Sequence, residues 1–86
     1  MKKYFICPIC GYEKLEEPPY DETGEPSFEV CSCCGCEFGF DLENNQLTIE
    51  EYRDRWLKNG AKWFSSEDRP QSWDLEKQLL NLLNNR

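Results

Sequence analysis

The sequence contains no histidine among its 86 residues, so no imidazole is available as a general base or as a metal ligand. It also has no Ser/Lys or Cys/His arrangement of a nucleophile with its base, and no glycine-rich phosphate loop. These absences remove the commonest machinery of hydrolytic and phosphoryl-transfer enzymes. We therefore expect a protein that is not an enzyme.

Long hydrophobic runs are also missing. Behind Lys2 and Lys3 the apolar stretch of residues 4–6 ends at once in Cys7 and Pro8, which is too short for a secretory signal peptide. No segment approaches the roughly 20 apolar residues that a membrane-spanning helix needs. We expect a cytoplasmic protein with no membrane partner, whose thiols are reduced or metal-bound.

Positive charge is scarce, since ten Lys and Arg residues face seventeen Asp and Glu residues and the formal net charge is -7. Binding of a nucleic-acid backbone depends on Lys and Arg neutralising phosphates. A nucleic-acid partner would require the fold to gather Arg53, Arg55, Lys58 and Lys62 into one patch, and we do not expect it. A basic protein partner suits the charge better.

Cysteine, in contrast, is abundant, and it occurs in an internal repeat. The octet ICPICGYE, residues 6–13, aligns with VCSCCGCE, residues 30–37. Each has a β-branched residue, Cys-x-x-Cys, glycine, one further residue and glutamate. We call these octets the first and second knuckles. The glycine after the second cysteine readily takes the positive φ of a tight turn that brings two sulfurs to one ion.

The alignment selects four ligands, which are Cys7, Cys10, Cys31 and Cys34. Four soft thiolates suit one Zn²⁺ per chain, with iron as the second choice. Such a site is normally closed, whereas catalytic zinc keeps a coordination position for water. A chain this small needs a staple, because its core alone supplies little stability. The metal is therefore predicted to be structural.

Cys33 and Cys36 fall opposite Ile9 and Tyr12 in the repeat and have two interpretations. In the first they pack as small hydrophobic residues. In the second they are redox thiols or alternative ligands that exchange with the zinc site or form a disulfide that ejects the metal. The sequence does not decide between the two.

The local patterns predict an α+β fold, in which a zinc ribbon-like unit of two β-hairpins is followed by two C-terminal helices. Strands are expected over residues 3–6, 13–16, 27–30 and 37–40, with the knuckles as turns. Residues 16–27 form an acidic, proline-rich loop that is either a connector or a recognition loop presenting Tyr20. We expect one domain over residues 1–86, with the ribbon in residues 1–42 and a helical part in residues 47–86 packing on it.

Two stretches predict helices. A capping box of Thr48 and Glu51 starts the first at Ile49, and Gly60 ends it after Asn59. The second is expected to run from a cap at Ser72 to residue 84. Its leucines cover more of the circumference than one core contact requires. That leaves a deep core contact and a homodimer through this helix as alternatives.

YFICPICGYEKLEEPP, a second Cys-x-x-Cys and LTIEEYRDRWLKNGA together resemble the cysteine-rich CPCC family of small bacterial proteins. The resemblance covers roughly residues 4–61 and implies a zinc ribbon-like domain without an assigned enzymatic activity. The sequence departs from the family in its CSCC knuckle, its longer loop and the CEFGF segment that follows. The four ligand positions are matched.

Three functions follow as hypotheses. The first is a zinc-stapled protein-interaction module, for which one concrete form is an immunity-like protein that masks a basic partner. The second is a thiol-based redox or metal sensor that uses Cys33 and Cys36. The third is a nucleic-acid-binding zinc ribbon, which the charge disfavours.

Overall fold

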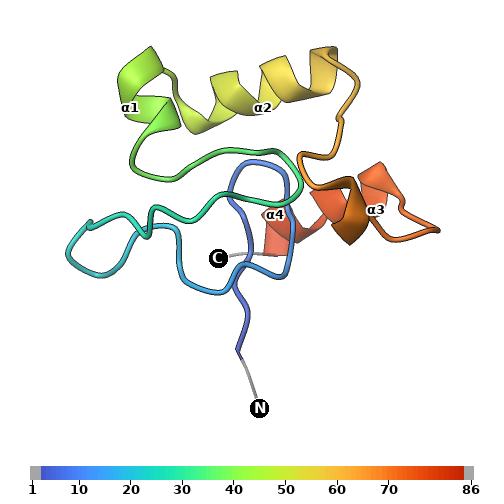
Figure 1. Cartoon of the computed structure of the whole chain (residues 1–86), viewed down its shortest axis with the longest axis horizontal. Helices are drawn as coiled ribbons and strands as arrows, with labels where there is room; N and C mark the ends of the chain where they lie inside the picture. Colours follow the sequence, from blue (N-terminus) through green and yellow to red (C-terminus); the bar gives the residue numbers. More distant parts are fainter. Residues whose placement is uncertain (1–2, 85–86) are drawn as a thin grey trace.

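The structure is a computed structural model that describes residues 3–84. Its helices follow one another as α1 (Asp41–Asn45), α2 (Ile49–Lys58), the short 3₁₀ helix η1 (Ser66–Asp68), α3 (Leu75–Leu79) and α4 (Asn81–Asn84). In Figure 1, α1 and α2 lie along the upper edge, α3 lies at the right below them, α4 runs from there toward the centre, and loops of the N-terminal half extend below. None of the helices in the described part has the length and apolarity needed to cross a bilayer.

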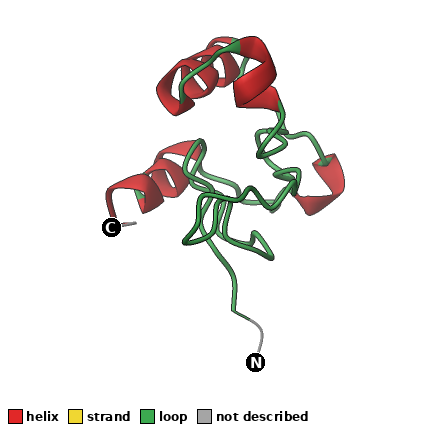
Figure 2. Ribbon diagram, turned by 90° about the vertical axis from the view of Figure 1, so that its left-hand side faces the viewer, coloured by secondary structure: helices red, strands yellow, loops and turns green. Residues whose placement is uncertain are grey.

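The zinc ribbon hairpins expected from the sequence are absent from residues 3–84, where Figure 2 shows helices and loops only. Each of the four expected strands contributes one residue to an isolated antiparallel bridge, Phe5 to Leu15 and Val30 to Glu37. A third bridge joins Tyr20 and Pro26 in the acidic loop. The fold is therefore a small mixed domain of helices and two knuckles whose arms pair at single positions.

Backbone geometry explains why the ladders stop. Phe28 and Gly39 stand on opposite arms of the second knuckle with φ values of 60° and 98°, which no strand accommodates. After the first knuckle, the N–H groups of Glu16 and Glu17 donate to the Glu29 carboxylate at 3.0 and 3.1 Å. A side chain thus takes the donors that a neighbouring strand would have used.

The predicted helix at Ile49 is confirmed as α2. Thr48 Oγ1 accepts from the N–H of Glu51 at 3.1 Å, and Glu51 Oε1 accepts from the N–H of Thr48 at 2.9 Å, which completes the capping box. At the other end, the N–H of Ala61 donates to Trp56 O at 2.8 Å across Gly60. This bond and the left-handed Gly60 form a Schellman motif that stops the helix.

The last predicted helix is wrong in its start and in its continuity. Asp74, not Ser72, is the N-cap, and its Oδ1 accepts from the N–H of Lys77 at 3.3 Å. The helix is interrupted at Leu80 into α3 and α4. Immediately after that break, the Asn81 side chain donates to Gly11 O of the first knuckle at 2.9 Å. Helix α1 lies before both of the helices that the sequence predicts.

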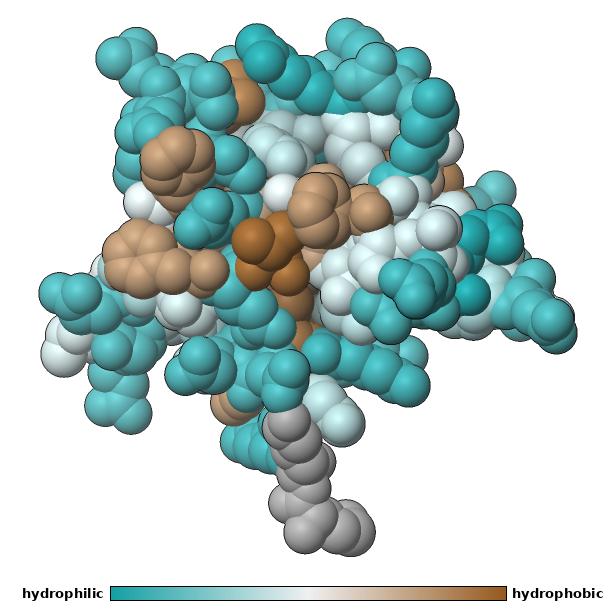
Figure 3. Space-filling model, in the orientation of Figure 1, coloured by the Kyte–Doolittle hydropathy of each residue, from teal (hydrophilic) through white to brown (hydrophobic). Residues whose placement is uncertain are grey.

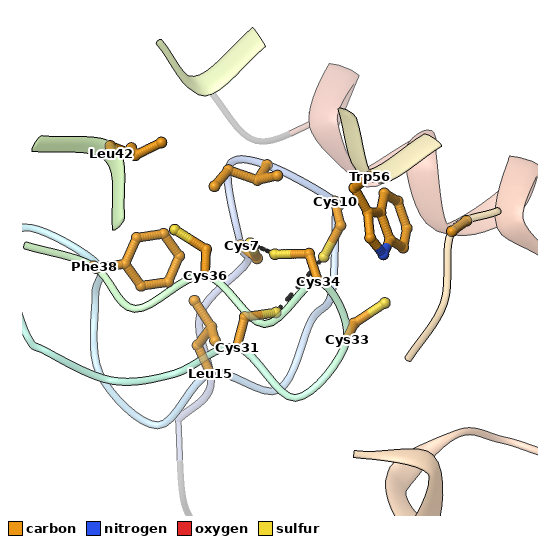
Figure 4. Packing of buried hydrophobic residues seen from close by; sticks show 12 residues of the cluster. Cys7, Cys10, Leu15, Cys31, Cys33, Cys34, Cys36, Phe38, Leu42 and Trp56 are labelled. Carbon is orange, nitrogen blue, oxygen red and sulfur yellow. Dashed lines mark hydrogen bonds between the residues drawn. The ribbon is translucent and has the colours of Figure 1, made fainter. Parts of the chain in front are cut away.

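The cysteines form the centre of the core. Of the twelve buried hydrophobic residues in the described part, six are cysteines, and the others are Ile9, Leu15, Phe38, Leu42, Trp56 and Ala61. Figure 4 shows the sulfurs gathered where the knuckles meet, with Phe38 and Leu42 on one side and Trp56 on the other. The helices therefore cover a core made mainly of the two knuckles.

Candidate metal centre

The two knuckles have the same backbone hydrogen bonds. In the first, the N–H of Gly11 donates to Cys7 O at 3.0 Å, and the N–H of Cys7 donates to the O of the residue after the glycine at 2.7 Å. In the second, Gly35 donates to Cys31 O at 2.9 Å and Cys31 donates to Cys36 O at 3.0 Å. Both glycines have positive φ, 84° and 79°. The repeat in the sequence is thus a repeat of a complete turn.

This symmetry brings together the four cysteines that the alignment selects. The Sγ atoms of Cys7, Cys10, Cys31 and Cys34 all lie within 4.8 Å of one another. Each close contact joins the knuckles, with 3.8 Å from Cys7 Sγ to Cys34 Sγ and 3.6 Å from Cys10 Sγ to Cys31 Sγ. Dashed lines mark these two contacts in Figure 4.

The sulfur separations fit a tetrahedral ion. Zinc–sulfur bonds of about 2.3 Å in a tetrahedron place neighbouring sulfurs about 3.8 Å apart. The two short separations, 3.8 and 3.6 Å, are of this size. Four buried cysteines with this spacing could therefore hold a metal ion.

The cysteine thiols of the cluster also shift one another's pKa values. The hydrogen bond with Cys31 raises the pKa of Cys10, and the same interaction lowers the pKa of Cys31. The two sulfurs are 3.6 Å apart, and either thiol can be the donor of this hydrogen bond. A divalent cation at the centre would replace the shared protons and stabilise all four thiolates.

The knuckle carbonyls at matching positions are satisfied by different donors. Arg53 of α2 reaches the first knuckle, where its Nε donates to Ile9 O at 2.6 Å and its Nη2 to Pro8 O at 2.9 Å. On the second knuckle, the backbone N–H groups of residues 64 and 65 donate to Cys33 O at 3.0 Å and Ser32 O at 2.9 Å. The sequence repeat predicted the turns but gave no sign of these donors, which lie far along the chain.

Helix α3 fixes the first knuckle from the other side. Gln78 Nε2 donates to Cys10 O at 3.0 Å and to Cys33 Sγ at 3.3 Å, while Gln78 Oε1 accepts from Trp73 Nε1 at 2.7 Å. A Cβ on Gly11 would collide with the backbone oxygen of Gln78. Gly11 is therefore required both for its positive φ and for this close approach.

Cys33 and Cys36 are both fully buried and lie outside the four-sulfur group. Burial raises the pKa of Cys36 to about 12. Hydrogen bonds from Cys10 and Gln78 act on Cys33 in the opposite direction and lower its pKa. Cys36 is thus a buried thiol of the core, and Cys33 Sγ accepts a hydrogen bond from Gln78 beside the cluster.

The cluster approaches the surface at one vertex. Cys7, Cys10 and Cys31 are completely buried, whereas Cys34 is 8% exposed and borders a pocket of about 310 Å³. The pocket is lined by Asn45, Leu47, Tyr52, Arg55, Trp56, Asn59 and Lys62. Any small molecule that reaches a sulfur of the cluster through this pocket meets Cys34 first.

Two of the four basic residues named for a nucleic-acid patch have other partners. Arg53 binds the first knuckle, and Lys58 pairs with Asp54 at 2.9 Å. Tyr20 of the acidic loop is half-buried, and its hydroxyl donates to Glu43 Oε2 at 3.1 Å. Its ring also packs edge-on against Phe38.

Fold and site together define a small cysteine-rich domain with a four-cysteine cluster that could hold a metal ion. Two Bacillus subtilis proteins are similar to it. The uncharacterized protein YozI is 31% identical over an alignment that covers 83% of this chain and 71% of YozI, and the uncharacterized protein YoaQ is 29% identical over 83% of this chain and 72% of YoaQ. The chain belongs to the same family as YozI. No family model matches, so the resemblance to the CPCC family is not confirmed, and no solved structure matches.

Proposed function

We propose that Cys7, Cys10, Cys31 and Cys34 hold one structural Zn²⁺ and that the domain is a non-enzymatic protein-interaction module with a basic partner. The observation that carries the proposal is the closed four-sulfur cluster at the junction of the knuckles. Four thiolates complete a tetrahedral shell, so no coordination position remains for substrate or activated water. Four soft thiolates suit zinc, with iron as the second choice.

Such an ion would act mainly on stability. Structural zinc contributes on the order of 10 kcal/mol in small domains, which equals the whole stability of many proteins of this size. The described chain has no regular sheet to hold the knuckles together. The metal would therefore be the main link between the first and the second knuckle.

The basic partner is supported by charge. The chain has a formal net charge of -7, and four thiolates around a divalent ion make the folded protein more acidic still. Complementary charge raises association rates and suppresses wrong partners. An immunity-like protein that masks a basic toxin is one form that this proposal takes.

Affinity capture from the protein's own cells tests the interaction module. Tagged zinc-loaded protein is compared with the same protein stripped of metal by a chelator under anaerobic conditions. We expect a basic protein at stoichiometric yield with the loaded form only. Absence of any stoichiometric protein with the loaded form would end the proposal.

The thiol-sensor hypothesis has one observation in its favour, the pocket that exposes Cys34. Peroxide entering there would take two electrons from Cys34 and a second cysteine, Cys33 or Cys36, leaving one disulfide and two molecules of water. The complete burial of both second cysteines argues against a fast reaction. Equal rates of peroxide-induced zinc release from the native protein and a C33A/C36A variant would reject this alternative.

A further inference from the structure

Large apolar side chains face solvent on the second knuckle, on its two arms and at residue 64. Phe28 is 58% exposed, Val30 37%, Phe40 50% and Phe64 68%. We call these four residues the aromatic patch. The three phenylalanines together expose roughly 350 Å², taking about 200 Å² for a whole side chain. An area of about 300–600 Å² is the usual size of the largest apolar patch on a monomer, and such a patch is often functional.

Three of the patch residues contact the second knuckle or the arm that follows it. A Cβ placed on Gly39 would lie 2.8 Å from Phe28 Cε1, so the Phe28 ring lies directly beside the neighbour of Phe40. Val30 bridges to Glu37 between the two arms. Phe64 sits against Gly35, where a Cβ would lie 3.0 Å from its Cδ1. In the view of Figure 3, several groups of apolar residues reach the surface in the middle and at the left, with hydrophilic residues between them.

Phe28 is held in an unfavourable backbone conformation. Its φ is 60°, a left-handed value that a bulky residue adopts only at a cost. Core packing does not account for this, since more than half of the side chain faces solvent. Backbone strain of this kind is often found at functional sites, which agrees with a role for Phe28 in binding.

The charges on the chain are strongly segregated around the same knuckle. Residues 15–52 contain no Lys or Arg, so all ten basic residues lie outside this segment. The segment holds eleven of the seventeen carboxylates, namely Glu16, Glu17, Asp21, Glu22, Glu25, Glu29, Glu37, Asp41, Glu43, Glu50 and Glu51. Three of the four patch residues belong to it. The apolar surface is thus part of the most acidic region of the chain.

We propose that the aromatic patch is the docking surface for a basic amphipathic segment of another protein, in which apolar anchors alternate with Lys or Arg. The phenylalanines bind the apolar face, and the carboxylates of residues 15–52 attract the flanking cations. This inference rests on the proposed interaction function and assigns it to one surface and one kind of partner.

Charge decides against other occupants. A second copy of the chain would bring two acidic segments together around the contact, and like charges across an interface are costly. Nucleic acid and anionic lipid are repelled by the same carboxylates. A basic protein segment is the occupant that both the aromatic rings and the charge fit.

Titration with a defined probe tests the surface. The probe is a fluorescein-labelled 14-residue peptide of Leu and Lys at helical amphipathic spacing. Two matched peptides replace all Leu with Ser or all Lys with Glu. Anisotropy of each peptide is measured against the zinc-loaded full chain at about 0.15 M salt. We expect binding of the Leu/Lys peptide only, and no binding of that peptide would overturn the proposal.

Two variants separate the patch from general acidity. F40S/F64S removes two exposed rings, and L80S removes a side chain of similar exposure, 53%, at the junction of α3 and α4. Each variant is first shown to bind the same amount of zinc as the native protein. We expect at least tenfold weaker peptide binding by F40S/F64S and unchanged binding by L80S. Equal affinity of all three proteins would show that charge alone attracts the peptide and would overturn the proposal.

Affinity capture from the protein's own cells with the same three proteins tests the interaction function and the docking surface separately. A basic protein lost only with F40S/F64S supports both. A partner retained equally by all three leaves the interaction function standing and overturns the docking surface. No stoichiometric partner with any of them rejects the interaction function itself. Dimerisation of the native chain that F40S/F64S abolishes in sedimentation would assign the patch to a second copy, against the proposal.

Discussion

Replacing Arg53 should cost the protein more stability than any other single change to a charged side chain of α2. Its guanidinium makes two hydrogen bonds, 2.6 Å to Ile9 O and 2.9 Å to Pro8 O, at the tip of the first knuckle. The Ile9 residue is completely buried. Removing the donors therefore leaves a carbonyl with little access to water.

The size of the effect follows from those two bonds. A hydrogen bond to a charged group is worth about 1.5–3 kcal/mol, and part of each is regained by water reaching the half-buried site. We expect R53A to lower the free energy of unfolding by about 3 kcal/mol. If zinc binds only the folded knuckles, that loss weakens apparent zinc affinity by about a hundredfold. R53K keeps the charge without the fork, so it should recover no more than half of the loss.

Anaerobic urea unfolding of zinc-loaded protein, followed by tryptophan fluorescence, measures the change. R55A is the matched control, because Arg55 is an exposed arginine of the same helix and surface changes usually stay within about 0.5 kcal/mol. Zinc affinity is measured in parallel by competition with a chromogenic chelator. A loss below 1 kcal/mol for R53A, or an equal loss for R55A, would refute the assignment of Arg53 as the support of the first knuckle.

Further predictions concern the backbone, the acidic loop and the metal. G11A should destabilise the protein by several kcal/mol more than G60A, because both positions have positive φ but only Gly11 meets the Gln78 backbone; equal losses in urea would contradict the contact. Q46G should stabilise the protein by about 1 kcal/mol, since Gln46 is exposed with φ of 52°; a lower unfolding midpoint would be the opposite result. Hydrogen bonds from the Thr23 hydroxyl and from loop N–H groups lower the pKa of Asp21 below 3.8, so these bonds should persist on acidification and be lost only as the pH falls through that lower value, which NMR titration of the loop amides checks. Removal of zinc by a chelator should abolish the cooperative unfolding transition, and an unchanged transition would show that the metal is not a staple.

The parts of the fold that the sequence predicts are those with a local or repeated cause. The two knuckles follow from an octet that occurs twice, and the equal hydrogen bonds of Gly11 and Gly35 show the same turn in both. Helix α2 follows from Thr48 and Glu51 at its start and Gly60 after its end. Each of these signals acts over a few residues, so it is readable without the tertiary structure.

The parts that it does not predict depend on distant contacts or on single dihedral angles. The strand patterns of residues 27–30 and 37–40 end in one bridge because Phe28 and Gly39 take positive φ, and nothing in the sequence marks Phe28 for that conformation. Arg53 is named from the sequence only as part of a possible nucleic-acid patch, and in the structure it binds the first knuckle, 44 residues away in the chain from Ile9. Such long-range donors become visible only when the elements are placed together.

The proposed stability and function of the domain depend on one zinc ion bound by four sulfurs. X-ray absorption at the zinc edge of a zinc-loaded C33A/C36A variant tests this directly, because that variant retains only Cys7, Cys10, Cys31 and Cys34. We predict one zinc per chain with four sulfur neighbours at about 2.3 Å. Loss of zinc from this variant, or a shell with fewer than four sulfurs, would contradict the assignment of the site.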